Sequence, residues 1–148
     1  MTDSEVRANF PGTLAKDMLS LCLGEAIGEG STRTVYRSTN PDYVYKFETS
    51  ARRFQNIMEW ETWDIIRLTK HKLWFVPCVD IADCGTILVQ KYARPLEIHE
   101  LPEDIPAYFA DVKQSNWGMY QGHPCCLDYG NTFLIDKGVN NKMRKAEW

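Results

Sequence analysis

The sequence has 148 residues, of which 44% are hydrophobic and 25% charged, and its formal net charge at pH 7 is −3. This length fits one domain with a sizeable core, and two full domains are not expected. An acidic balance without clustered Lys and Arg excludes sequence-independent nucleic-acid binding as the expected function, while a small anionic ligand bound locally stays compatible with it.

The expected location is the cytoplasm, without membrane contact. No segment reaches the apolar length of a transmembrane helix, and the N-terminal sequence lacks the basic region and apolar core of a secretory signal. The five cysteines have no Cys-x-x-Cys spacing; they are Cys22, Cys78, Cys84, Cys125 and Cys126. They indicate reduced, mostly buried thiols rather than a zinc or redox site.

In chain order, the first predicted element is a short amphipathic helix before Gly24. Strands follow around Val35–Tyr36 and Tyr43–Tyr45. The turn formers of residues 38–42, STNPD, lie between these strands and predict an antiparallel hairpin.

A longer helix is predicted over residues 50–71, because this segment contains neither Pro nor Gly, and Ser50 is its expected N-cap. The predicted apolar face repeats at intervals of three, at Ile57, Trp60, Trp63 and Ile66. These large side chains are expected in the core, although a chain this short can leave some of them uncovered.

Two strands are predicted around the turn sequence ADCG, residues 82–85, and the second ends at Lys91–Tyr92. Three prolines limit residues 94–109 to a brief helical turn. The remaining predicted elements are, in order, a strand at 117–120, a turn at 121–124, a strand at 125–135 and a frayed polar tail at 136–148. This order predicts an α+β fold.

A pair of glycines, Gly28 and Gly30, lies between two strand-like segments. Missing side chains there let backbone amides approach phosphate oxygens closely. The alternative for this pair alone is a plain hairpin turn with both glycines at positive φ. A dinucleotide-binding turn fits less well, because strand-like residues rather than a helix follow Gly30.

Lys46 ends a predicted strand, from which its flexible ammonium can reach phosphate oxygens. Such a lysine needs an acid to hold it, and the predicted helix offers Glu59 and Glu61. We favour Glu59, because Trp63 and Ile66 follow it at four and seven residues and share its face. The alternative is ordinary solvated charge for Lys46 and either acid.

The segment DVKQSN, Asp111–Asn116, places an acid, a base and an amide together. It fits a solvated turn, but it also resembles the catalytic loop of protein kinases, with Lys two residues and Asn five residues after the Asp. Asp128-Tyr129-Gly130 resembles the metal-binding Asp-Phe-Gly turn of the same family. The glycine pair, Lys46 and Glu59 precede these motifs in the family's order.

The resemblance implies a protein-kinase-like α+β fold in a single domain, residues 1–148. An antiparallel N-terminal sheet with one helix would occupy residues 23–93, and a much reduced catalytic lobe residues 94–148. Residues 1–22 would form an N-terminal helix or extension.

The resemblance also implies ATP and Mg²⁺ as ligands. Asp111 would orient the attacking hydroxyl and accept its proton, and Lys113 would neutralise charge on the transferred phosphoryl group. Asn116 and Asp128 would be the metal ligands. The resemblance also implies a hinge-like segment at Lys91–Ala93, whose backbone groups would contact adenine. The side chains implied in binding the nucleotide are those of Val35, Lys46, Glu59 as the ion-pair partner of Lys46, Gln90 just before the hinge-like segment and Tyr92 within it, together with Gly28 and Gly30.

The sequence departs from the family in several places. The interval between Tyr92 and Asp111 is too short for two long helices, and we expect no counterpart of the family's activation segment in residues 131–148. Phe109-Ala110 replaces the His-Arg pair before the catalytic Asp, and Arg33 replaces the third loop glycine. Lys113 favours a Ser/Thr protein kinase over small-molecule kinases. The compact form, including Asn116-Trp117-Gly118, resembles short kinase-like proteins of tailed bacteriophages.

The expected function is thus ATP- and Mg-dependent phosphoryl transfer, most like a minimal Ser/Thr protein kinase with a protein substrate. The alternative is a nucleotide-binding or non-catalytic pseudokinase that acts as a protein-interaction module. A third possibility is an α+β domain whose motif matches are accidental. A protein partner or a homo-oligomer would cover apolar surface left by the missing helices, and for a phage protein the location would be the host cytoplasm.

Overall fold

The structure is a computed structural model that describes residues 23–30, 32–48, 54–132, 134 and 138–148. The helix predicted before Gly24 and the N-cap predicted at Ser50 lie outside the described residues. Within the described part of the chain, no helix combines the length and the hydrophobicity needed to cross a bilayer.

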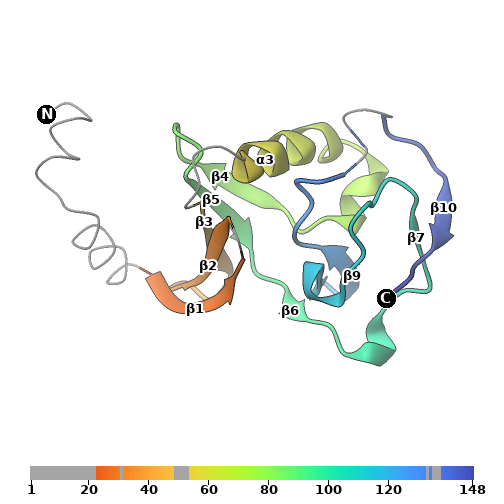
Figure 1. The fold of residues 1–148 in the computed structure, drawn as a ribbon, viewed down its shortest axis with the longest axis horizontal. Helices are drawn as coiled ribbons and strands as arrows, with labels where there is room; N and C mark the ends of the chain where they lie inside the picture. The colour runs from red at the N-terminus through yellow and green to blue at the C-terminus, as the bar shows by residue number, and fades with distance from the viewer. Residues whose placement is uncertain (1–22, 31, 49–53, 133, 135–137) are drawn as a thin grey trace, which may run out of the picture.

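An antiparallel five-stranded sheet forms the first part of the fold (Figure 1). Its strands, in the spatial order β1-β2-β3-β5-β4, are β1 (Leu23–Glu29), β2 (Arg33–Ser38), β3 (Tyr43–Glu48), β5 (Ile87–Lys91) and β4 (Cys78–Ile81). With the helix described next, this sheet confirms the α+β class.

The predicted hairpin is β2 and β3, with Tyr36 opposite Tyr45. The side chains of its turn close it locally. Ser38 Oγ accepts a hydrogen bond from the Asn40 amide at 3.1 Å, and Asn40 Oδ1 accepts one from the Asp42 amide at 3.1 Å. Such short-range bonds explain why the turn was predictable from sequence.

The helix α3 (Gln55–Ile66) lies beside β4 and β5 (Figure 1) and is shorter than predicted. Glu48, at the end of β3, accepts hydrogen bonds from the amides of Gln55 at 2.7 Å and Asn56 at 3.2 Å, which satisfies donors of the first helical turn. At the other end, Thr69 accepts a bond from the amide of His71 and caps a separate 3₁₀ helix, Lys70–Trp74. The prediction of one helix through residue 71 was therefore wrong.

The predicted apolar face of α3 is confirmed only in part, because Ile66 is fully buried while Ile57, Trp60 and Trp63 are not. The buried residues of α3 are Asn56, Glu59, Thr62 and Ile66. Trp60 and Trp63 are only partly buried, although both pack against the core. The inner face is mostly polar because it lies against charged side chains of the sheet.

The second part of the fold is small and has little regular structure. A three-stranded antiparallel sheet has the order β6 (Arg94–Pro95), β8 (Trp117–Tyr120) and β9 (His123–Cys126), and a separate pair joins β7 (Asp104–Pro106) to β10 (Met143–Lys145). Single 3₁₀ turns occur at Ile98–Glu100 and Gln114–Asn116. The β7–β10 pair lies at the opposite end of the molecule from β1 and β2 (Figure 1).

Three predictions for this part needed correction. The turn predicted at 121–124 narrows to Gln121 and Gly122, both at positive φ, as a tight hairpin turn requires. The strand predicted at 125–135 ends at Cys126, where the chain turns towards Glu59 instead of continuing beside β8. The tail does not fray along its whole length, because β10 pairs with β7 and Arg144 donates to the carbonyl of Phe109 at 2.7 Å.

The core lies where the two parts meet. Phe75 is its central aromatic residue, with ring centroids 4.9 Å from Tyr129 and 5.1 Å from Phe109, and Phe109 lies 5.0 Å from Trp117. All of these side chains are buried. Phe109, which lies two residues before Asp111, is therefore a core residue.

Candidate functional site

A cleft of about 1250 Å³ lies between the five-stranded sheet and the small second part. The predicted site residues that line it from the sheet side are Gly28, Gly30, Val35, Lys46 and, just after β5, Tyr92. Those that line it from the other side are Asp111, Lys113, Asn116 and Asp128. The two predicted site residues that do not line it are Glu59 and Gln90.

The glycine strand forms one wall of the cleft. Gly28 in β1 pairs with Val35 in β2, and the amide of Gly30 donates to the carbonyl of Arg33 at 2.8 Å. The alternative of a hairpin is confirmed in that β1 and β2 pair antiparallel, but neither glycine has the positive φ that this alternative expected. A methyl group on Gly28 would meet only the side chain of Val35, at 3.8 Å. The fold therefore tolerates a side chain there, and the bare backbone leaves space inside the cleft.

Lys46 and Glu59 form a buried ion pair at the back of the cleft. β3 directs Lys46 inward, where it is 2% exposed, and α3 presents Glu59, which is fully buried. The ammonium of Lys46 bonds to Oε1 of Glu59 and also donates to the carbonyl of Leu127. The predicted choice of Glu59 over Glu61 as the partner of Lys46 is confirmed, since Glu61 is exposed.

The carboxylate of Glu59 also accepts hydrogen bonds from three other segments of the chain. Its Oε2 accepts from Arg33 at 3.1 Å and from the amide of Tyr129 at 3.3 Å, and its Oε1 accepts from the amide side chain of Gln90 at 3.4 Å. A fully buried carboxylate needs such partners, because desolvation strongly disfavours an unpaired charge. Gln90 is thus placed behind Glu59, and its predicted place at the ligand was wrong.

Arg33 is the functional candidate that sequence reasoning missed. Its guanidinium donates to Asn56 at 3.2 Å, to Glu59 at 3.1 Å and to Asp128 at 2.7 Å. Burial opposes its charge, but the carboxylates of Glu59 and Asp128 outweigh burial and raise the pKa of Arg33 above its ordinary value. One signal was available: Arg33 and Val35 are two residues apart in a strand and so share a face.

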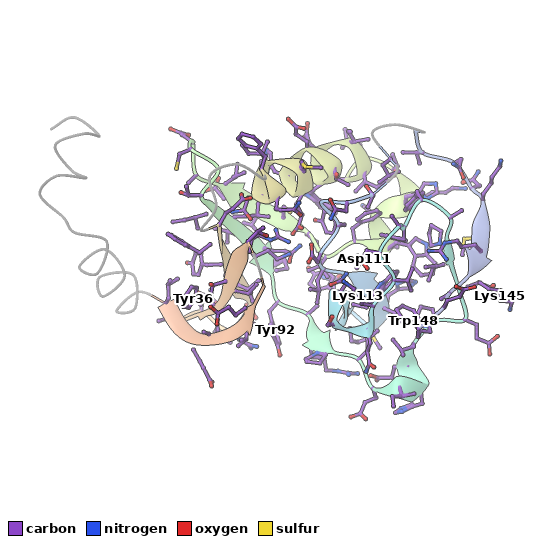
Figure 2. The ribbon with its side chains drawn as sticks, viewed as in Figure 1. Tyr36, Tyr92, Asp111, Lys113, Lys145 and Trp148 are labelled. Carbon is purple, nitrogen blue, oxygen red and sulfur yellow. The ribbon has the colours of Figure 1, made fainter. Side chains whose placement is uncertain are left out.

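The segment Asp111–Asn116 forms the opposite wall. Asp111 Oδ2 lies 3.3 Å from the ammonium of Lys113 and accepts a weak bond from the amide side chain of Asn116 at 3.4 Å. Figure 2 shows Asp111 and Lys113 side by side near the middle of the molecule, with Tyr92 towards the β1–β2 hairpin. The segment also contains a real turn, since the Asn116 amide donates to the carbonyl of Lys113 at 2.9 Å.

Backbone bonds bring the two candidate metal ligands into neighbouring loops. The amide of Leu127, directly before Asp128, donates to the carbonyl of Asn116 at 2.8 Å. Carboxylate and amide oxygens are the hard donors that Mg²⁺ prefers, so the residue types fit this ion. Among the described residues, no group of three or more His, Cys, Asp or Glu side chains is arranged to hold a metal ion.

The hinge-like segment differs from its prediction. The amide of Lys91 donates to the carbonyl of Pro77 at 2.9 Å, and the amide of Tyr92 donates to the carbonyl of Asp42 at 2.8 Å. These two N–H groups are therefore not available to adenine, which contradicts the prediction for the amides of Lys91 and Tyr92, although Tyr92 and Ala93 both line the cleft. The ring of Tyr92 is covered by the guanidinium of Arg37, 3.2 Å from the ring centroid, which is close enough for a cation–π interaction.

No protein-family model matches this sequence, and no curated protein matches it either. The geometry and chemistry of the cleft are therefore the basis for assigning a function.

Proposed function

We propose that this protein is an ATP- and Mg-dependent phosphotransferase with a protein-kinase-like fold, most like a minimal Ser/Thr protein kinase. One observation carries the proposal: a single cleft joins a glycine strand, a strand lysine braced by a helix glutamate, and an Asp-Asn loop beside a second Asp. Phosphoryl transfer needs these groups for positioning and for neutralising charge.

The sheet side of the cleft would hold the triphosphate. Two of the three N–H donors of the Lys46 ammonium are used by Glu59 and Leu127, which leaves a third for a phosphate oxygen. Gly28 and Gly30 carry no side chain that would keep phosphate oxygens from the backbone, and of their two amides that of Gly30 already donates to the carbonyl of Arg33. The buried partners of Glu59 keep Lys46 in place, so little reorganisation is needed when the nucleotide binds.

The other side of the cleft would carry the reacting groups. Asn116 and Asp128 would hold Mg²⁺, which when bound neutralises charge on the β- and γ-phosphates. Asp111 would accept the proton of the attacking hydroxyl as its oxygen bonds to the γ-phosphorus and the bond to ADP breaks. Lys113, 3.3 Å from Asp111, would stabilise negative charge on the transferred group.

The direct test is transfer of radiolabelled γ-phosphate from Mg-ATP to the protein itself and to a cell lysate. We expect signal from the wild type and a loss of about a hundredfold or more in Asp111→Asn and Asp128→Asn. The control is Asp64→Asn, since Asp64 is an exposed residue of α3 whose partner is Arg67. Equal transfer by the wild type and by Asp111→Asn would contradict the assigned role of Asp111.

A non-catalytic pseudokinase that binds another protein is the second candidate. Two observations favour it: Asp128 is already paired with Arg33, and three large apolar side chains between the end of α3 and Trp74 are exposed, namely Ile65, Leu68 and Leu73. Mg-ATP that raises the melting temperature without any transfer would favour a nucleotide-binding pseudokinase. No shift at all would favour a pure interaction module.

A further inference from the structure

Arg33 holds the carboxylate that the proposed function assigns to the metal. Its Nη2 lies 2.7 Å from Oδ1 of Asp128. We infer that Arg33 keeps free divalent cations away from Asp128, so that the cleft selects a metal–nucleotide complex and rejects the metal alone. This inference rests on the proposed function and names the form in which the ligand enters.

The guanidinium is held firmly enough to act in this way. Its side chain is only 8% exposed, and its other bonds reach Asn56 at 3.2 Å and Glu59 at 3.1 Å. Asn56 is fixed in turn by its own bonds to the carbonyls of Lys46 and Gly85, both at 3.0 Å. The planar guanidinium of Arg33 has an acceptor in each of Asn56, Glu59 and Asp128 and is therefore pre-organised. Moving it away from Asp128 is costly.

Charge balance gives the physical reason for selectivity. The cluster pairs two cations, Arg33 and Lys46, with two carboxylates, Glu59 and Asp128. A divalent cation alone would add two positive charges to a neutral, partly desolvated cluster, next to a guanidinium that cannot lose its proton. A metal that arrives with a polyphosphate brings compensating negative charge. The same phosphate also offers the guanidinium a new acceptor.

The test measures binding of Mn²⁺ alone, without nucleotide, by the electron paramagnetic resonance signal of free Mn²⁺. Arg33→Gln should bind Mn²⁺ about tenfold tighter than the wild type, because Asp128 is released and one positive charge is removed. The double variant Arg33→Gln with Asp128→Asn should lose this gain. The charge-matched control is Arg67→Gln, since Arg67 is exposed and paired with Asp64 on α3.

Equal Mn²⁺ affinity of the wild type and a folded Arg33→Gln would overturn the inference, as would a gain that survives in the double variant. If Arg33→Gln does not fold, the inference is tested instead in the wild type, by the chemical shifts of the guanidinium ¹⁵N resonances of Arg33. Mg²⁺ alone should leave them unchanged; a shift with Mg²⁺ alone would overturn the inference. Failure of the wild type to bind Mg-ATP would instead refute the proposed function. The Mn²⁺ affinities of the wild type and Arg33→Gln would still test the role of Arg33.

Discussion

Lys46 and Glu59 form an ion pair in which both side chains are almost completely removed from water: 2% of Lys46 and none of Glu59 is exposed. The two residues come from β3 and α3, so the pair joins the sheet to its helix. Desolvation of two charges is costly, and it is offset here because Arg33, Gln90 and the amide of Tyr129 also donate to Glu59.

Removal of Glu59 should therefore destabilise the protein severely. Glu59→Ala leaves two buried cations without their shared anion, and we expect the free energy of unfolding to fall by about 3–5 kcal/mol. Glu61→Ala is the matched control, because Glu61 is exposed on the same helix and its loss should cost less than about 0.5 kcal/mol. Urea denaturation followed by tryptophan fluorescence measures both; similar midpoints for the two variants would contradict the prediction.

Substitution by alanine should affect Gly28 and Gly118 differently, because Gly28 lines the cleft and Gly118 is closely packed. A methyl group on Gly28 would meet no atom closer than 3.8 Å, whereas one on Gly118 would lie 2.7 Å from Cβ of Ala93 and 3.0 Å from the carbonyl oxygen of Arg94. Gly118→Ala should destabilise the fold by about 1–3 kcal/mol.

Gly28→Ala should leave thermal stability nearly unchanged or slightly higher, because alanine restricts the unfolded chain. It should weaken Mg-ATP binding about tenfold, since the methyl group would stand between phosphate and backbone. Thermal melts with and without Mg-ATP separate the two effects. Unchanged nucleotide affinity in Gly28→Ala would remove this glycine from the proposed site.

The four described cysteines should differ sharply in reactivity. Burial raises the pKa of Cys78 and of Cys125 to about 12 and that of Cys126 well above its ordinary value. Cys84 is exposed, and its hydrogen bond with the hydroxyl of Thr86 lowers its pKa. Because the thiolate is the nucleophile, iodoacetamide at pH 8 should label Cys84 about a hundredfold faster than the other three.

Peptide mass spectrometry over a time course measures this order of labelling. Equal labelling of all four in guanidinium chloride is the control for intrinsic reactivity. Labelling of Cys125 at the rate of Cys84 in the native protein would show that the interface between the two parts of the fold opens readily.

The Arg94–Glu100 pair should persist in acid. Hydrogen bonds from Arg94, at 2.6 and 2.8 Å, hold the pKa of Glu100 at about 2, below its ordinary value of 4.5. Since the pKa is lower in the folded than in the unfolded state, the stabilisation is fully present above pH 4.5 and is lost as the pH falls towards 2.

Carbon-13 NMR titration of the Glu100 carboxyl group tests this directly. Arg94→Gln should return the midpoint towards 4.5, because the first and largest cause of the shift is the bond from Arg94. An unshifted midpoint in the wild type would show that the pair does not form in solution.

Local sequence determined a substantial part of this protein. The β2–β3 hairpin follows from turn formers that bond within a few residues of one another, at Ser38 and Asn40. The pairing of Lys46 with Glu59 follows from helical periodicity, which decides that Glu59 and not Glu61 shares a face with Ile66. Both inferences depend on contacts or spacings that short-range geometry controls.

Only the tertiary structure decided the polar interior and the ends of the elements. The inner face of α3 is polar because Arg33 from β2 and Lys46 from β3 lie against it. The start of α3 is set by Glu48 at the end of β3, whose carboxylate accepts a hydrogen bond from the amide of Gln55. A buried charge is stable only when distant segments supply its partners, and no pattern along the chain encodes which segments meet. The contact of Arg33 with Asp128, residues 95 positions apart, could therefore be seen only in the folded chain.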